Sequence, residues 1–143
     1  MPGLKVHIHL TAQWATEEGL DPVEARAVAQ ADVSVDRLWP GSKKWGRHFN
    51  PSASLYYAPT ELRRAIALAK AGERTAALEH LGYSLHSAQD AVGHGRLGQK
   101  HLLQTWGLTS INPDEWEPMS ASVKRRIEAA TRRIVRRFVS ASS

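Results

Sequence analysis

The chain has 143 residues, seven histidines, no cysteine and a formal net charge of +5. This length predicts one domain, and an apolar share of 42% is enough for a core without disulfides. The absence of cysteine excludes thiolate metal sites and cysteine nucleophiles. The chain contains neither a signal-peptide pattern nor about 20 consecutive apolar residues, so we expect a cytoplasmic protein without a transmembrane segment.

Helix-forming patterns follow one another along the first half of the chain. A first helix is expected from about residue 10 to Gly19. A second helix is expected from Asp21, a capping residue, and Pro22, which suits the first helical turn, to about Leu38. Residues 39–59 are rich in proline, glycine, serine and aromatic residues, and they predict a long loop of a kind that is often functional.

Further helical patterns fill the second half, and no useful stretch alternates as a strand would. The expected helices cover residues 60–70, 73–92, 99–106 and, after a turn-rich linker at 110–119, an amphipathic basic segment at 120–139. The sequence therefore predicts one all-α domain over residues 1–143. About five to six helices would form a compact bundle around a metal site.

The metal prediction comes first from three residues near the end of the helix expected at 73–92. His86, Asp90 and His94 are spaced i, i+4 and i+8, which places them on one helix face. Histidine and aspartate bind zinc and other divalent ions where no thiolate is present. Gly82, one turn earlier, leaves room for a neighbouring group. The direction of His94 is left open because Gly93 can end the helix, and a hydrogen-bonded pair without metal is the alternative for His86 and Asp90.

Other candidate ligands lie elsewhere in the chain. Asp32 and Asp36 repeat the i, i+4 spacing on a helix rich in alanine and valine, where carboxylates need a cation or an arginine as partner. Arg26 and Arg37 are the arginines that offer the alternative to a metal. The remaining histidines that we consider as ligands are His7, His9, His48 and His101. His80 is placed on the far side of its helix from His86.

The order of these residues over the first two-thirds of the chain resembles the zinc-dependent phospholipase C and single-strand nuclease superfamily, and in particular its compact bacterial members. The matching segments are His7-Ile8-His9-Leu10-Thr11, the alanine-rich helix ending in Asp36, His48-Phe49-Asn50, and Leu81-Gly82-x-x-Leu85-His86-x-x-Gln89-Asp90-x-x-x-His94. The resemblance implies a helical bundle around one to three zinc ions, or another divalent metal.

The same resemblance implies a role for each ligand. Asp36, His48, His86 and Asp90 would surround one ion, Asp90 would bridge to a second ion held partly by His7, and His94 and His101 would belong to a third position. Asp36 is also implied as general base for the attacking water, with Asp32 beside it as the alternative. The chain departs from the family pattern because it begins Met1-Pro2 instead of with tryptophan, and because Thr105 stands where a glutamate follows the last histidine. These differences favour one or two ions.

The function expected from this site is hydrolysis of a phosphate ester, of the phosphodiester, phospholipid or nucleotide class, by metal-activated water. Trp45, Arg47 and Tyr56 in the loop at 39–59 are predicted to bind the substrate through stacking and charge. The alternative for the aromatic residues is packing of the loop onto the bundle. Two other functions stay open: a metal-dependent tailoring enzyme for a peptide or small natural product, and a non-catalytic binding protein stabilised by metal.

The positive charge is concentrated in the C-terminal segment. From Ser122 onward there are seven basic residues and one acidic residue, a net of +6, so the remainder of the chain is close to neutral. Four arginines lie one turn apart and are able to hold an anionic partner, such as nucleic acid, an anionic membrane or an acidic peptide: Arg132, Arg133, Arg136 and Arg137. A core helix with a solvated cationic face is the alternative. Nothing in the sequence indicates the oligomeric state.

Overall fold

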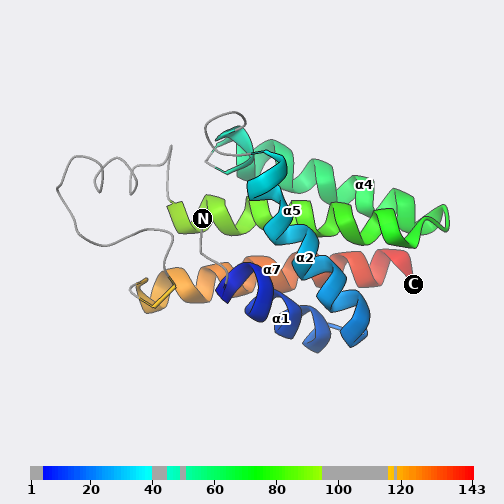
Figure 1. Cartoon of the computed structure of the whole chain (residues 1–143), viewed down its shortest axis with the longest axis horizontal. Helices are drawn as coiled ribbons and strands as arrows, with labels where there is room; N and C mark the ends of the chain where they lie inside the picture. Colours follow the sequence, from blue (N-terminus) through cyan, green and yellow to red (C-terminus); the bar gives the residue numbers. More distant parts are fainter. Residues whose placement is uncertain (1–4, 40–44, 49–50, 95–115, 118) are drawn as a thin grey trace.

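The computed structural model describes residues 5–39, 45–48, 51–94, 116–117 and 119–143, without the side chains of Lys5, Trp45 and His94. The α-helices in this part of the chain are α1 (Thr11–Glu17), α2 (Pro22–Leu38), α4 (Ala58–Lys70), α5 (Arg74–His94) and α7 (Ala121–Ser142). Three short helical segments accompany them: η1 (Lys5–Leu10), η2 (Trp45–Arg47) and η3 (Ala53–Tyr57). No strand occurs among the described residues, and the fold is all-α, as the sequence predicts (Figure 1).

The ends of the helices follow from local chemistry. Asp21 caps α2 by accepting hydrogen bonds of 2.9 Å from the backbone N–H groups of Val23 and Glu24. Gly72 has a φ of +83° directly after α4, a conformation that glycine adopts without strain. Ser120 caps α7 through a 3.2 Å hydrogen bond from the backbone N–H of Val123. These signals are visible in the sequence, and the predicted bounds of α2 are confirmed.

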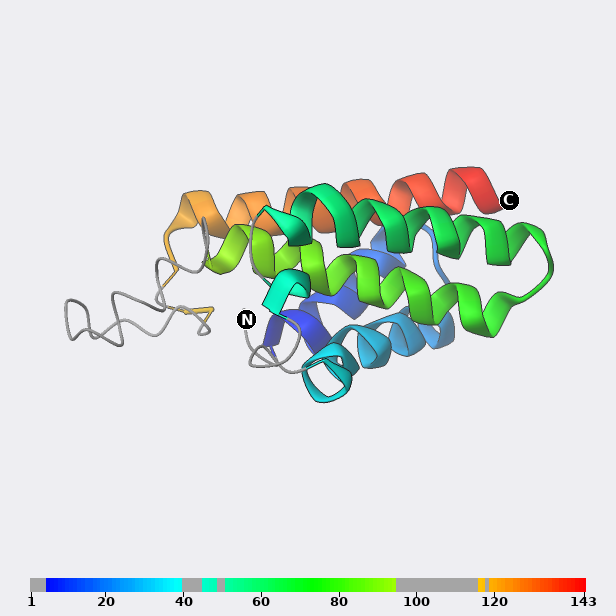
Figure 2. The same ribbon diagram turned by 90° about the horizontal axis from the view of Figure 1, so that it is seen from above.

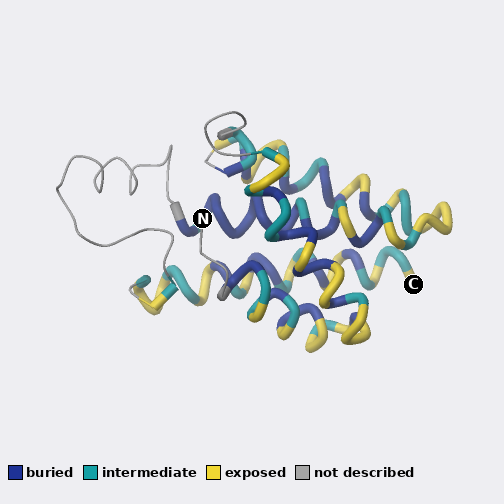
Figure 3. Tube along the Cα trace, in the orientation of Figure 1, coloured by how far each residue is buried: buried dark blue, intermediate teal, exposed yellow. Residues whose placement is uncertain are grey.

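Helix α5 lies at the centre of the molecule and contacts α2, α4 and α7. Seen from above, α4, α5 and α7 run alongside one another, and α1 and α2 lie against one face of this layer (Figure 2). The chain is buried along most of α5, whereas the outer faces of the other helices are exposed (Figure 3). The main core cluster joins Leu81 and Leu85 of α5 to Val28 of α2 and to Val135 and Phe138 of α7.

The structure differs from the sequence prediction at several helix ends. The π-helical segment η1 precedes α1 where no helix was expected, and Thr11 fixes it with a 2.8 Å hydrogen bond to the carbonyl oxygen of Val6. The expected loop at 39–59 contains η2 and η3, and α5 continues through Gly93 to His94. The helix expected at 99–106 and most of the linker at 110–119 lie outside the described residues.

None of the described helices combines the length and the apolar character that crossing a membrane requires.

Candidate metal centre

The centre forms where α2 and α5 approach each other closely at Gly82. A Cβ atom at this position would lie 2.5 Å from Cβ of Ala31, 2.6 Å from the carbonyl oxygen of Val28 and 2.7 Å from the backbone nitrogen of Asp32. Only glycine therefore allows the two backbones to pack this tightly. His86 follows one turn later on α5, opposite Asp32, so the glycine contact sets the distance between the two groups of candidate ligands.

Four side chains from three segments converge on one point: Asp36 of α2, His48 directly after η2, and His86 and Asp90 of α5. Asp90 Oδ2 lies 2.8 Å from His48 Nδ1 and 2.9 Å from His86 Nε2, and these two nitrogens are 3.1 Å apart. Asp36 Oδ1 lies farther out, 3.4 Å from His86 Nε2 and 3.7 Å from His48 Nδ1.

These distances fit a single divalent ion. Zinc–nitrogen and zinc–oxygen bonds of about 2.0–2.2 Å place tetrahedral ligand atoms roughly 3.3–3.5 Å from one another. The observed separations, from 2.8 to 3.7 Å, bracket that value. His48, His86 and Asp90 are almost completely buried, whereas the Asp36 side chain is 27% exposed. The centre is therefore closed on the α5 side and reaches solvent beside Asp36.

The two central histidines each present one ring nitrogen to this point because the other is engaged elsewhere. His48 Nε2 donates to the carbonyl oxygen of Trp39 at 2.6 Å, so Nδ1 faces the cluster. His86 Nδ1 donates to Asp32 Oδ1 at 3.2 Å, so Nε2 faces Asp36 and Asp90. An acceptor behind the outer nitrogen is the usual support of a metal-binding histidine.

His7 of η1 completes the buried group. Its Nδ1 lies 2.6 Å from Asp32 Oδ1 and 2.8 Å from Gln89 Oε1. Both oxygens are acceptors, so this nitrogen carries the proton. Its Nε2 makes no hydrogen bond to the part of the chain that the structure describes, and lies 3.5 Å from Asp90 Oδ1. The ring stacks on that of His86 with centroids 4.3 Å apart. The inward nitrogen of His7 thus faces the second oxygen of Asp90.

A second potential grouping, His7, Asp32 and His86, shares His86 with the first. A neutral imidazole carries a proton on one nitrogen and cannot offer both as ligands. When His86 Nε2 faces Asp36, Asp90 and His48, its Nδ1 is the donor to Asp32. We therefore interpret Asp32 as the support that orients His7 and His86.

The charges in the cluster shift the pKa of its members in the metal-free protein. Burial lowers the pKa of His86, but the charge of Asp90 and hydrogen bonds to Asp32, Asp36 and Asp90 outweigh it and hold that pKa well above 6.5. Burial likewise opposes the charge on Asp90, yet His86 keeps the pKa of this carboxyl well below its usual value. For His7, Asp32 overcomes burial and raises the pKa to about 8. Protonated His86 and the Asp90 carboxylate thus neutralise each other where a cation would otherwise sit.

Two further groups support the candidate ligands. Gln89 Nε2 donates to Thr11 Oγ1 at 2.8 Å and to Thr131 Oγ1 at 3.0 Å, which fixes its oxygen toward His7. Sequence reasoning missed Thr131, a fully buried polar residue on the apolar face of α7. A polar residue within an apolar helix face was the signal that could have pointed to it. Because Gln89 joins η1, α1 and α7 to α5, the orientation of His7 depends on all these segments.

Arg47 forms the second group, a clamp that holds the segment carrying His48. Its guanidinium lies 3.8 Å above the ring of Trp39 and 4.6 Å from the ring of Tyr57, and it pairs with buried Glu61 at 3.4 Å. In the structure its guanidinium lies against groups of the protein itself, and substrate binding by this residue stays a prediction.

The remaining predicted residues are placed as follows. His9 is exposed, and His80 lies 2.5 Å from Glu61, outside the cluster. Tyr56 is exposed and packs edge-on against Tyr57. The side chains of Trp45 and His94, and the whole of His101 and Thr105, lie outside the described residues.

No protein-family model, no curated protein and no solved structure matches this chain. What the fold and the site define is a class: an all-α protein with a buried histidine–aspartate cluster whose geometry suits a divalent cation.

Proposed function

We propose that this protein is a metal-dependent hydrolase of phosphate esters, with a divalent ion, zinc in the first place, held by His48, His86 and Asp90. The observation that carries the proposal is the convergence of their three buried donor atoms within 2.8–3.1 Å of one another, beside a fourth, partly exposed carboxylate. A donor set of imidazole and carboxylate without thiolate suits zinc and also other first-row divalent ions. The cytoplasmic location stays a prediction from the sequence.

The partly exposed carboxylate has the position of a general base. Asp36 is the outermost member of the set, and its Oδ2, although buried, accepts no hydrogen bond from the described residues. A carboxylate with one oxygen toward the candidate ligands and a second oxygen without a partner among the described residues is able to orient a water molecule and accept its proton. Asp32 is less suited to this role because it is fully buried and accepts from Thr11 and His86.

When bound, the metal would supply Lewis acidity, which lowers the pKa of water toward about 7 and attracts a phosphate oxygen. The protein's own side chains orient the ligands and accept a proton. Asp32 fixes the ring of His86, the carbonyl oxygen of Trp39 fixes the ring of His48, and Asp36 accepts the proton of the attacking water. The expected reaction is attack of water on phosphorus with release of the alcohol, and the expected substrates are phosphodiesters, phospholipids or nucleotides.

One observation favours a second candidate function, a protein that uses the metal for stability alone. Asp36, His48, His86 and Asp90 together would fill a tetrahedral site, and a site filled by four protein ligands is typical of structural zinc. The role of Asp36 therefore decides between the two candidates.

The deciding experiment combines metal content with activity. We expect at least one divalent ion per chain by elemental mass spectrometry, and hydrolysis of bis(4-nitrophenyl) phosphate that EDTA abolishes. His86→Ala should lose both the ion and the activity, whereas Asp36→Asn should keep the ion and lose activity by about 100-fold or more, as expected for a general base. His9→Ala, at an exposed histidine, is the matched control.

Each result has a definite meaning. Less than one ion per chain after purification with zinc, manganese or iron present would overturn the metal centre. A stoichiometric ion without hydrolysis of phosphomonoesters or phosphodiesters would support the structural role instead. Retention of activity in Asp36→Asn would contradict its assignment as base.

A further inference from the structure

A groove lies on the opposite side of α5 from the metal centre, between α4 and α7, and has a volume of about 480 Å³. Its floor is apolar and is formed by alanines and by two larger aliphatic side chains: Ala58, Leu62, Ala88, Ala91, Ala130 and Ile134. Pockets that bind small molecules commonly have volumes of about 300–1,000 Å³ with apolar walls and few polar groups. The groove therefore has the size and the lining of a ligand site.

The groove is separate from the metal centre because the two use different faces of α5. At 100° per residue, Ala88 and Ala91 point about 140–160° away from His86, whereas Asp90 points about 40° from it. The inference drawn from the groove consequently does not rest on the proposed hydrolase function.

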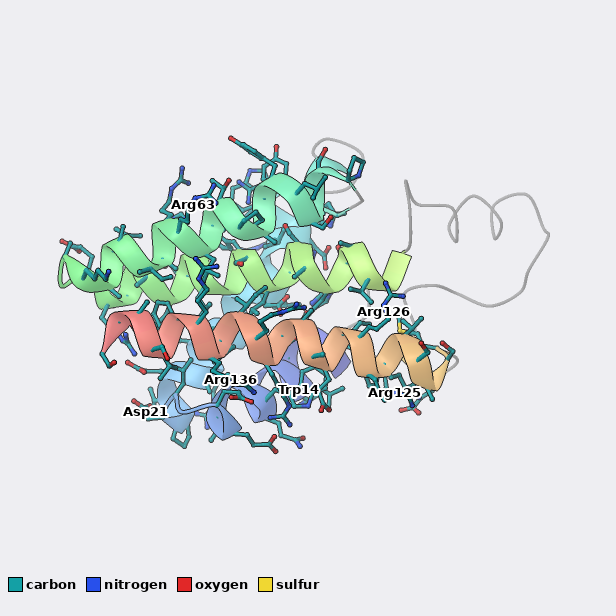
Figure 4. All side chains as sticks on the ribbon, turned by 180° about the vertical axis from the view of Figure 1, so that it is seen from behind. Trp14, Asp21, Arg63, Arg125, Arg126 and Arg136 are labelled. Carbon is teal, nitrogen blue, oxygen red and sulfur yellow. The ribbon has the colours of Figure 1, made fainter. Side chains whose placement is uncertain are left out.

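Three arginines of α7 form one wall of the groove: Arg126, Arg133 and Arg137. Among the described residues none of them has an ion pair. The arginines on the other side of the helix do: Arg136 pairs with Glu18 at 2.9 Å, and Arg132 pairs with Glu17 at the end of α1 and with Glu18 directly after it. Arg126 lies between α7 and α5, whereas Arg125 and Arg136 lie on the side of α7 that faces away from α5 (Figure 4).

The basic helix thus has two distinct faces. On one face its charge is used inside the protein to hold α1. On the other, up to three positive charges line an apolar groove without acidic partners among the described residues. A ligand that matches this surface has an apolar body for the floor and an anionic head for the wall. A phosphate monoester carries about 1.5 to 2 negative charges at pH 7 and accepts paired hydrogen bonds from guanidinium groups.

We propose that this groove binds a single-chain amphiphile whose head is a phosphate monoester. Arg133 and Arg137, one helical turn apart, bind the phosphate head, and the apolar floor of the groove contacts the alkyl chain of the ligand. Arg126, about two turns from Arg133, adds to the positive potential of the same wall.

The test is calorimetric titration of the full chain with dodecyl phosphate below its micelle concentration. We expect saturable binding that weakens as salt increases. The double variant Arg133→Gln/Arg137→Gln should bind at least tenfold more weakly. The matched control Arg26→Gln/Arg125→Gln removes the same charge at exposed positions away from the groove and should bind within twofold of the wild type. All variants should fold, because the arginines that they change are exposed.

Related ligands test each part of the proposal. Inorganic phosphate and butyl phosphate should bind at least tenfold more weakly, dodecyl maltoside should not compete, and dodecanoate should bind more weakly than dodecyl phosphate. Treatment with EDTA should leave the binding unchanged. The proposal is overturned by equal affinity of the groove variant and the control, or by equal binding of inorganic phosphate or of dodecyl maltoside. Loss of binding with EDTA while circular dichroism shows the chain still folded would also overturn it, because it would place the phosphate at the metal centre.

Discussion

The substitution Gly82→Ala tests whether the contact between α2 and α5 builds the metal centre. The added Cβ would lie 2.5–2.7 Å from atoms of α2, and ordinary contact begins near 3.4 Å. Two of the three nearest atoms belong to the backbone, so rotation of a side chain does not relieve the contact. The helices must therefore move apart by roughly 0.7–0.9 Å, the shortfall from ordinary contact.

The expected cost follows from two opposing effects. Overpacking of this kind destabilises by about 1–3 kcal/mol, and alanine gains about 1 kcal/mol over glycine in a helix. Because the contact involves rigid backbone, we expect a net loss near the upper end, about 2 kcal/mol of unfolding free energy. Asp32 and Asp36 move with α2, so we also expect metal affinity to fall by about 10–100-fold, as when supporting groups are lost.

Urea unfolding of the metal-free protein and competition with a fluorescent chelator measure these two effects. Glu79→Ala, at an exposed position of the same helix, is the control and should leave both quantities nearly unchanged. A Gly82→Ala protein as stable as the wild type, with the same metal affinity, would refute the claim that helix separation at this glycine positions the ligands.

Four further predictions concern the supports of the centre and the protons that its histidines hold. Asp32→Asn weakens the hydrogen-bond acceptor behind His86, so metal affinity should fall about 10–100-fold in the chelator assay. An unchanged affinity would contradict the assignment of Asp32 as a support of His86. Arg47→Lys keeps the charge, but a lysine ammonium cannot lie flat on two rings while it pairs with Glu61. Metal affinity should therefore fall nearly as far as in Arg47→Leu. Wild-type affinity in the lysine variant would contradict the role of the guanidinium in holding the segment that carries His48. The pKa of His7 is raised from 6.5 to about 8, which corresponds to about 2 kcal/mol of unfolding free energy. This stabilisation is fully present below pH 6.5 and is lost as the pH rises through 8. The unfolding free energy of the metal-free protein, measured with urea, should therefore decrease over this interval. Metal affinity should change in the opposite direction and increase with pH, because the ion displaces the proton that His86 holds.

The parts of the fold that sequence reasoning predicted are those fixed by local chemistry. Asp21 with Pro22 defines the start of α2, and Gly72 defines the end of α4, because capping and positive φ depend on a few neighbouring residues. Gly93 misled the prediction because glycine in a helix costs only about 1 kcal/mol, which the packing of a central helix outweighs. The π-helical η1 has no comparable local signal.

The candidate site was predicted in part for the same reason. The i, i+4 spacings of His86 with Asp90 and of Asp32 with Asp36 are local patterns, and the structure brings all four residues together. The different roles of the two α2 aspartates depend on what packs around each, and spacing carries no such information. The division of the basic helix into a face paired with Glu18 and a face along the groove is likewise tertiary.

The buried cluster also bears on how a chain without cysteine resists unfolding. Its contacts join residues far apart in sequence: 42 positions separate His48 from Asp90, 54 separate Asp32 from His86, and 82 separate His7 from Gln89. Of these pairs only His48 and Asp90 are both candidate ligands, and an ion held by them would close the loop between them in the way that a disulfide does. The entropy removed from the unfolded chain grows with the length of that loop. Metal exchange would then make this cross-link reversible, so the supply of the ion would set how long the folded chain survives heat and proteases.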